Sequence, residues 1–217
     1  MKHNVPPLRS SEIPGVILAG GLSTRMGVDK AHVRLGGVSL IVRAVQRLGL
    51  QVSSVAISAN GPLAVECTLG APVFADLGGE RSGPLGGILS ALAHVREHHP
   101  LATHVATVPT DSPFFPIDLV ARLGAAIDHP ERIAVASSSG GLHSVFGLWP
   151  VALADDLADW LRDGQSLRLR TWLDRHGASQ VHFPDRETPR GPFDPFFNIN
   201  TPEELALAES WLGTLEP

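Results

Sequence analysis

Cysteine, long apolar runs and basic clusters are what this sequence has least of. The 217 residues include one cysteine, Cys67, which excludes an internal disulfide framework and fits a reducing compartment. No run approaches the roughly 18 apolar residues of a membrane-spanning helix. Without a basic block, a net charge of −5 argues against nucleic-acid binding. We therefore expect a cytoplasmic protein whose partners include neither nucleic acid nor membrane.

The overall composition is that of a globular protein, with 43% hydrophobic and 18% charged residues. Its length suits one domain. The polar, proline-containing beginning has no apolar stretch of the kind a signal peptide needs. We expect residues 1–13 to form a flexible N-terminal tail and residues 14–217 to form a single domain.

Short apolar runs alternate along the chain with stretches of helical spacing. This alternation predicts a three-layer α/β/α, Rossmann-like fold with a mostly parallel sheet. Ligands of such sheets bind beyond the carboxyl ends of the strands, which selects the loops after Ala19, Ala75 and Val108. The predicted strands are 15–19, 55–58, 72–75, 104–108, 133–136, 142–149 and 181–183, and the predicted helices are 38–48, 88–98, 116–127, 151–162, 166–176 and one that opens at 201–204.

The loop after the first strand, LAGGLSTRMGVDK at 18–30, is the most informative stretch. Adjacent Gly20 and Gly21 allow backbone N–H groups to approach an anion, and Arg25 and Lys30 add positive charge. A polyphosphate tail requires this combination, whereas the glycine pair alone would also fit a plain tight turn. The spacing matches neither GxxxxGK[ST] nor GxGxxG, so both of these nucleotide loops are excluded.

The same string resembles the LAGGxSxRMGxDK signature of nucleotidyltransferases with a glycosyltransferase-A-like fold, also called the nucleotide-diphospho-sugar transferase fold. Together with Asp76, GPLGG at 83–87, VPTDSP at 108–113 and FNINTPEEL at 197–205, it is similar in order and spacing to the molybdenum cofactor guanylyltransferase family. This resemblance implies transfer of GMP from GTP to molybdenum-bound molybdopterin, release of pyrophosphate and a Mg²⁺ cofactor. It also allows transient contact with molybdoenzymes or their chaperones.

The predicted catalytic residues are Arg25, Lys30 and Asp111. Nucleotidyl transfer joins two anionic partners, so the catalyst must neutralise charge and hold an in-line geometry. Mg²⁺ does this with phosphate oxygens and one or two carboxylates, and Asp111 lies just beyond a predicted buried strand. By resemblance Asp111 is the magnesium residue, although an Asp here would also cap a turn. We expect Lys30 at the α-phosphate and Arg25 at the β- and γ-phosphates.

A carboxylate accepts both donors on the Watson–Crick edge of guanine, so Asp76 is a candidate for reading the base. It could instead hold the ribose or cap a turn. Ser58 stands where related enzymes carry an asparagine. By resemblance, the GTP site comprises Leu18, Ala19, Gly20, Lys30, Ser58, Asp76 and Asp111.

Asn198 and Asn200 precede a predicted capping box at 201–204, in which Thr201 caps and Glu204 reaches back. If 198–200 is a strand, both amides face the same way and could bind nucleotide or pterin. The alternative is two turn asparagines. Arg186 and Arg190, in the proline-rich loop 184–195, are weaker candidates for the pterin phosphate.

Three other functions remain open at this point. A cytidylyltransferase could act on the same pterin, and a guanylyltransferase could act on another phosphorylated small molecule. A noncatalytic GTP-binding carrier is the third. Pyrophosphate release separates the carrier from the enzymes, and a comparison of GTP with CTP separates the two nucleotide specificities.

Overall fold

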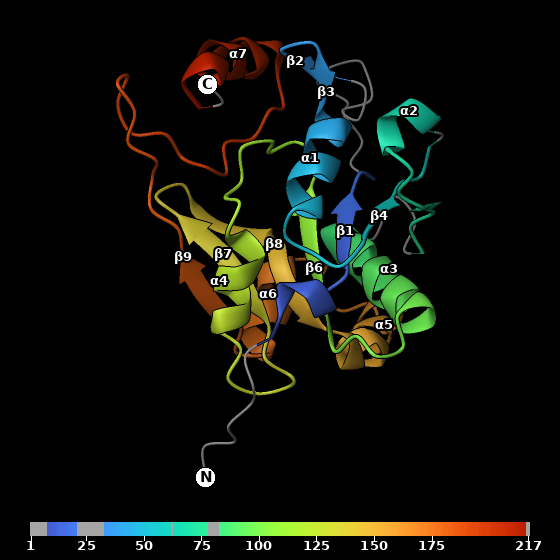
Figure 1. The fold of residues 1–217 in the computed structure, drawn as a ribbon. Helices are drawn as coiled ribbons and strands as arrows, with labels where there is room; N and C mark the ends of the chain where they lie inside the picture. The colour runs from blue at the N-terminus through green and yellow to red at the C-terminus, as the bar shows by residue number, and fades with distance from the viewer. Residues whose placement is uncertain (1–7, 21–32, 62, 78–82, 216–217) are drawn as a thin grey trace.

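The computed structural model describes residues 8–20, 33–61, 63–77 and 83–215 (Figure 1). These residues form a seven-stranded sheet in the order β5-β4-β1-β6-β8-β7-β9 and a separate two-stranded sheet, β2-β3. The strands are β1 (Gly15–Leu18), β2 (Arg34–Leu35), β3 (Val38–Ser39), β4 (Val55–Ser58), β5 (Val73–Phe74), β6 (His104–Pro109), β7 (Ala134–Ser138), β8 (Gly141–Pro150) and β9 (Ser179–His182).

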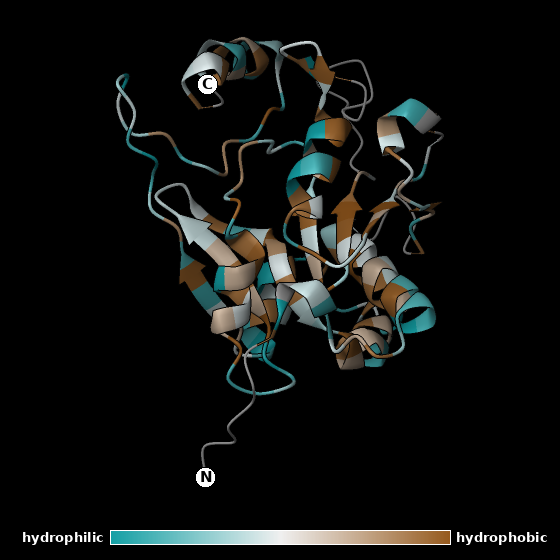
Figure 2. Ribbon diagram, viewed as in Figure 1, coloured by the Kyte–Doolittle hydropathy of each residue, from teal (hydrophilic) through white to brown (hydrophobic). Residues whose placement is uncertain are grey.

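Helices cover both faces of the large sheet, which confirms the predicted three-layer α/β/α fold. One apolar cluster packs α1 and α4 against one face, and a second packs α3, α5 and α6 against the other. Figure 2 shows β1, an interior strand between β4 and β6, as mostly hydrophobic. The helices are α1 (Leu40–Gly49), α2 (Val65–Thr68), α3 (Gly83–His98), α4 (Leu119–Ala125), α5 (Ala154–Arg162), α6 (Leu169–Arg175) and α7 (Pro202–Leu215), with 3₁₀ turns η1 (Ser10–Glu12) and η3 (Val151–Leu153).

The sheet is mostly parallel, as predicted. Strand β1 pairs in parallel with β4 and β6, β4 with β5, and β7 with β9. Strand β8 is antiparallel to both of its neighbours, β6 and β7. Its direction relative to β7 follows from the two-residue turn that joins them, because so short a connection cannot cross over to a parallel strand. The carboxyl ends of β5, β4, β1, β6 and β7 therefore lie along one edge of the sheet.

Several predicted boundaries shift. The helix predicted at 116–127 forms only as α4, and the one predicted at 88–98 begins at Gly83, so that Pro84 occupies its first turn. The helix predicted at 38–48 starts at Leu40, because Val38 and Ser39 pair with Leu35 and Arg34 in the β2-β3 hairpin. A pairing of two-residue strands leaves little trace in hydrophobic periodicity.

The C-terminal helix packs on the β2-β3 hairpin through a third apolar cluster. Gly36, in the hairpin turn, has φ +57°, and a Cβ there would lie 2.2 Å from Cδ2 of Leu212 on α7. Glycine is thus needed both for the turn and for the close approach of α7. The buried members of the cluster are Val33, Leu35, Leu40, Phe114, Phe193, Ile199, Ala208 and Leu215.

The structure describes residues 8–13 of the predicted N-terminal tail. Ile13 is 1% exposed and belongs to the cluster that packs α1 and α4 on the sheet. The carbonyl oxygen of the next residue, Pro14, accepts a hydrogen bond from the N–H of Ala106. Within the described ranges, no helix is both long and apolar enough to span a membrane.

Burial at the start of β6 perturbs one histidine. His104 is 2% exposed, its Nδ1 lies 3.0 Å from Oγ1 of Thr103, and its Nε2 is buried without a hydrogen-bond partner among the described residues. Desolvation lowers the pKa of His104 from 6.5 to about 4. The folded protein therefore keeps this imidazole neutral at pH values where the unfolded chain protonates it.

We expect His104 to make the folded state less stable in mild acid. Between pH 6.5 and 4 the unfolded chain binds a proton that the folded chain does not, so stability falls as the pH falls. Between pH 7 and pH 5 this single residue should lower the free energy of unfolding by about 2 kcal/mol. Denaturant unfolding at both pH values tests this, and His104→Leu should remove that part of the difference. An unchanged pH dependence in the variant would contradict it.

Candidate functional site

The residues that the sequence singled out in the described chain lie along one edge of the sheet. Asp76 follows β5, Gly20 follows β1 and Asp111 follows β6, and these strands end at the same edge. The loops after Ala19, Ala75 and Val108 are thus brought together, as the rule for open α/β sheets predicts. The strand order places Asp76 at one end of the row and Asp111 at the other.

The end of β1 is held on both sides. Leu18 lies opposite Ser58 in β4 and Pro109 in β6. The N–H of Ala19 donates to the carbonyl oxygen of Ser58 at 2.8 Å, and Oγ1 of Thr110 donates to that of Leu18 at 3.3 Å. Ser58 is 2% exposed, so its side chain is buried in the sheet. This bonding fixes the backbone from which the predicted phosphate loop departs.

Two glycines lie beside the Asp76 carboxylate. A Cβ on Gly20 would lie 3.7 Å from Oδ2 of Asp76, and a Cβ on Gly87 would lie 3.8 Å from the same atom. The Gly87 position would also lie 3.3 Å from Cδ1 of Leu18, so glycine lets α3 approach the end of β1. Gly87 of the GPLGG run thus serves close packing of α3 on the end of β1, and the Asp76 carboxylate lies near both Gly20 and Gly87.

Two residues that the sequence analysis missed hold Asp76. Oδ1 of Asn60 accepts a hydrogen bond from the N–H of Asp76 at 3.1 Å, and Oγ of Ser90 donates to Oδ1 of Asp76 at 2.8 Å. Asn60 comes two residues after β4, so a search beyond the strand end would have found it. Ser90 lies within α3, and nothing in its local sequence marks it as a partner of Asp76.

The C-terminal motif contacts the Asp111 loop. Oγ of Ser112 donates to Oδ1 of Asn198, which is 86 residues away in the sequence. The N–H of Ile199 donates to the carbonyl oxygen of Asp111 at 2.8 Å. Asp111 is half-buried and follows β6 directly after Thr110. The fold therefore places the exposed Asn198 beside the predicted magnesium residue.

The strand expected at 198–200 does not form, so the argument that both asparagines face one way is wrong. The segment is irregular and leads into α7. Oε2 of Glu204 accepts from the N–H groups of Asn200 at 2.6 Å and Thr201 at 3.0 Å, and Oγ1 of Thr201 accepts from the N–H of Glu204 at 3.2 Å. The predicted capping box is confirmed. A ligand-binding role for either asparagine stays a prediction.

A further polar cluster, which we call the Ser138 clasp, comprises Ser138, His143 and Asp194. Oγ of Ser138 donates to Oδ2 of Asp194 at 2.7 Å and lies 2.6 Å from Nε2 of His143. The hydroxyl has one hydrogen, so Nε2 of His143 is the donor in the second bond. Ser138 thus lies between the other two, whereas a nucleophilic serine needs the histidine in the middle. The clasp is therefore a structural link and not a catalytic triad.

The clasp joins the β7-β8 turn to the segment that leads to Asn198. Oδ1 of Asp194 accepts from the N–H of Phe196 at 2.8 Å, and the His143 ring stacks on that of Phe196 with centroids 4.5 Å apart. Burial lowers the pKa of His143, and the neighbouring Asp194 opposes this shift. Because Ser138 ends β7, the clasp lies at the same edge of the sheet as Asp111.

The two arginines of the loop 184–195 bind the C-terminal helix. Nη1 of Arg186 donates to the carbonyl oxygen of Leu215 at 2.8 Å. Nη1 of Arg190 donates to that of Ser210, and its guanidinium lies 4.6 Å from the ring centroid of Trp211. These contacts tie the loop to α7. The sequence analysis had instead considered these arginines as ligands of the pterin phosphate.

Arg25 and Lys30 lie outside the described residues, so their contacts with phosphate stay predictions.

The donors at Asp111 fit a magnesium ion that is held mainly by its substrate. In the part of the chain that the structure describes, no three His, Cys, Asp or Glu residues are grouped to hold a metal by themselves. Mg²⁺ is usually bound by one or two carboxylates, waters and substrate phosphates, all of which are oxygen donors. Asp111 supplies such a carboxylate, and the amide oxygen of Asn198 lies close by on Ser112.

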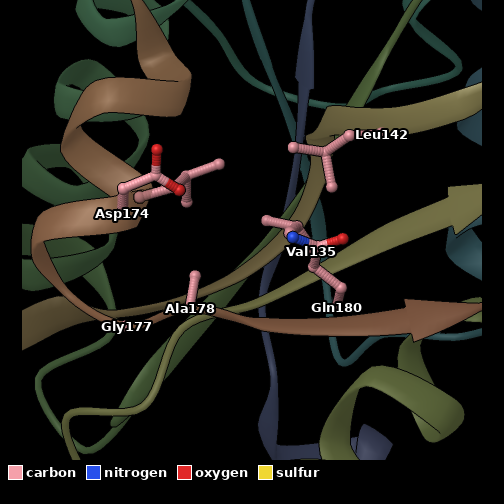
Figure 3. A pocket seen from close by; sticks show the side chains of 7 residues that line it. Val135, Leu142, Asp174, Gly177, Ala178 and Gln180 are labelled. Atoms are coloured by element: carbon pink, nitrogen blue, oxygen red, sulfur yellow. The ribbon is translucent and has the colours of Figure 1, made fainter.

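A separate cavity of about 150 Å³ lies between α6 and strands β7, β8 and β9 (Figure 3). Asp174 is the charged residue among those that line it. Sites for drug-sized ligands usually measure about 300–1,000 Å³. The cavity contains none of the predicted site residues, so we do not assign the nucleotide to it. It is lined by Val135, Leu142, Leu173, Asp174, Gly177, Ala178 and Gln180.

Comparison with known proteins agrees with this arrangement. Residues 15–181 match the family model of the MobA-like NTP transferase domain. The chain is 48% identical over 206 residues to a molybdenum cofactor guanylyltransferase of Rhizobium rhizogenes, covering 95% of both sequences.

Two solved structures share the fold. One is the molybdopterin-guanine dinucleotide biosynthesis protein A of Archaeoglobus fulgidus (TM-score 0.66, 22% identity, 93% of this chain and 99% of that one). The other is a Mycobacterium tuberculosis protein in complex with manganese (TM-score 0.64, 16% identity, 92% of this chain and 98% of that one). From the family model and the 48% identity it follows that this chain belongs to the molybdenum cofactor guanylyltransferase family of nucleotidyltransferases.

Proposed function

We propose that this protein transfers GMP from GTP to molybdenum-bound molybdopterin, forming molybdopterin guanine dinucleotide and releasing pyrophosphate. The observation that carries the proposal is the single row of Asp76, Gly20 and Asp111 at the carboxyl edge, with Asn198 against the Asp111 loop. The identity to a named guanylyltransferase supports it. A cytoplasmic location and contact with molybdoenzymes or chaperones remain predictions.

In the proposed reaction each part of the row has one task. The backbone of Leu18, Ala19 and Gly20, held by β4 and β6, lies beside the nucleoside, and Asp76 accepts hydrogen bonds from it. Asp111 would hold Mg²⁺, which when bound would supply positive charge at the α-phosphate and the departing pyrophosphate. A phosphomonoester is already ionised at pH 7, so the chain needs no general base to activate the acceptor.

The strand order also suggests where the acceptor enters. Asp76 and Gly20 lie on the β5-β4-β1 side of Asp111, so the nucleoside occupies that half of the edge. Strands β8 and β7 lie on the other side of β6, and the Ser138 clasp lies at the end of β7. An in-line attack on the α-phosphorus is then made from the β8-β7 side.

A nucleotide panel tests the reaction. Purified protein, molybdopterin and Mg²⁺ are incubated with GTP, CTP or ATP, and pyrophosphate is measured. We expect release with GTP and its loss when EDTA removes the metal. Equal turnover with CTP would favour the cytidylyltransferase alternative, and GTP binding without pyrophosphate release would favour a noncatalytic carrier.

Asp76→Asn tests recognition of the base. The amide has one acceptor oxygen where the carboxylate has two, so we expect the kcat/KM for GTP to fall about 10-fold or more. The kcat/KM for CTP should change less, because cytosine lacks the paired donors of guanine. Asp163→Asn, at an exposed position at the end of α5, is the matched control and should leave both values unchanged. An equal loss for GTP and CTP would assign Asp76 to the ribose instead.

A further inference from the structure

Ser90 is a buried hydroxyl in an otherwise apolar part of α3. It is 1% exposed, and its neighbours in the helix, Ile88, Ala91 and Leu92, belong to the apolar cluster on that face of the sheet. A buried hydroxyl is costly unless it is hydrogen-bonded. A helical serine usually satisfies itself on the carbonyl four residues earlier, and Oγ of Ser90 does lie 2.8 Å from that of Gly86.

The same hydroxyl reaches out of the helix to the chain after β5. Oγ of Ser90 is 2.8 Å from Oδ1 of Asp76 and accepts the N–H of Leu77 at 2.7 Å. Its one hydrogen can point to the carboxylate or to the Gly86 carbonyl, and the charged acceptor forms the stronger bond. Ser90 therefore binds the side chain of Asp76 and the backbone of the residue after it.

The backbone of Asp76 is held from a second direction. Asn60, after β4, accepts the backbone N–H of Asp76 at 3.1 Å. The second carboxylate oxygen, Oδ2, lies where Gly20 and Gly87 carry no side chain. One oxygen of the carboxylate is thus bound by Ser90, while the other lies near Gly20 and Gly87.

We propose that Ser90 is a positioning residue for nucleoside recognition, which fixes the plane of the Asp76 carboxylate before GTP binds. The inference rests on the proposed function of Asp76. A carboxylate already oriented by a buried donor loses less rotational freedom when the nucleoside binds. Removing the donor should weaken GTP binding and leave the chemical step unaffected, since Ser90 lies in α3 on the Asp76 side of the row.

A double-mutant cycle tests this coupling on the full-length protein. The Kd for GTP with Mg²⁺ is measured by calorimetry for the parent, Ser90→Ala, Asp76→Asn and the double variant. We expect Ser90→Ala to raise the Kd about 10-fold in the parent and less than about twofold in the Asp76→Asn background. The KM for GTP should rise while kcat at saturating GTP stays within about twofold of the parent. Equal effects of Ser90→Ala in both backgrounds would overturn the inference.

Thr107→Val controls for a general loss of stability. Thr107 is 1% exposed in β6, accepts a hydrogen bond from Nε1 of Trp149 at 2.7 Å and donates to the carbonyl oxygen of Val145 at 2.6 Å. This variant also removes a buried hydroxyl, so its Tm should fall at least as far while its GTP affinity stays unchanged. A parallel loss of GTP affinity in Thr107→Val would mean that Ser90 acts only through stability.

Two outcomes separate this inference from the proposed function. If Asp76→Asn binds GTP as tightly as the parent, the proposed role of Asp76 fails. If Asp76→Asn weakens binding and Ser90→Ala does not, only the role of Ser90 fails. Alanine is a better helix former than serine, so α3 should tolerate the change. Ser90→Cys keeps the size and donates only weakly, and it should give an intermediate Kd.

Discussion

Asp111→Asn is expected to reduce Mg²⁺-dependent pyrophosphate release about 1,000-fold, the size of effect seen when a charge-stabilising group is removed from an active site. The amide is nearly the same size as the carboxylate but carries no charge, so it cannot hold a hard cation as firmly. The fold should survive, because the backbone contact with Ile199 remains and the asparagine keeps a side-chain oxygen that can accept from Ser112. Turnover at increasing Mg²⁺ concentration, with Tm as the check on folding, measures the effect.

The control for this experiment is again Asp163→Asn, which removes one negative charge at an exposed position just after α5. If activity depended only on net charge, both variants would lose it to a similar extent. Near-normal turnover in Asp111→Asn at ordinary Mg²⁺ concentration would exclude Asp111 as the metal residue. Asp111 would then be a turn residue of the loop after β6.

The second large effect is expected for Asp194→Ala, which opens the Ser138 clasp. The substitution leaves the Ser138 hydroxyl and the N–H of Phe196 without their acceptor. Unsatisfied buried donors cost roughly 1–3 kcal/mol each, so the free energy of unfolding should fall by about 3 kcal/mol. Because Asp194 precedes Asn198 on the β8-β7 side, we also expect the KM for molybdopterin to rise about 10-fold while the Kd for GTP changes less than about twofold.

Gly140→Ala provides an independent way to disturb the clasp. A Cβ on Gly140 would lie 2.4 Å from Oδ2 of Asp194, so the carboxylate must move although its charge and partners remain. The direction of both effects should match Asp194→Ala, with smaller size. An equal loss of GTP and molybdopterin binding in the two variants would show that the clasp supports the whole fold and not the acceptor side.

Much of the site was predictable because its residues follow strands. Asp76 stands directly after one apolar run and Asp111 three residues after another, and the rule that parallel strands end at one edge was enough to group them. The capping box of Thr201 and Glu204 is equally local, since both partners lie within one helical turn. Such features depend on residues that are close together in the chain, so the spacing of residue types in the sequence is enough to predict them.

Other parts of the site depended on partners distant in the chain. Asn60 and Ser90 are 16 and 14 residues from Asp76, and Asp194 is 56 residues from Ser138. No periodicity connects such pairs, and each residue taken alone has the character of an ordinary turn or helix residue. The strand that 198–200 was expected to form failed for the same reason, because the Ser112 hydroxyl and the cap of α7 bind that segment.

From the order of the amino acids alone came the α/β/α layering, the loops that carry the chemistry and the likeness to a nucleotidyltransferase family. Hydrophobic periodicity and short motifs involve residues that are close in sequence, so they can be recognised without knowledge of the fold. The pairing of β8 with β6, the hydrogen bonds of Ser90 and Asn60 to Asp76, and the contact of Asn198 with the Asp111 loop were decided in three dimensions. Each arises when segments far apart in sequence pack together and buried polar groups must find the partners that this packing places within reach.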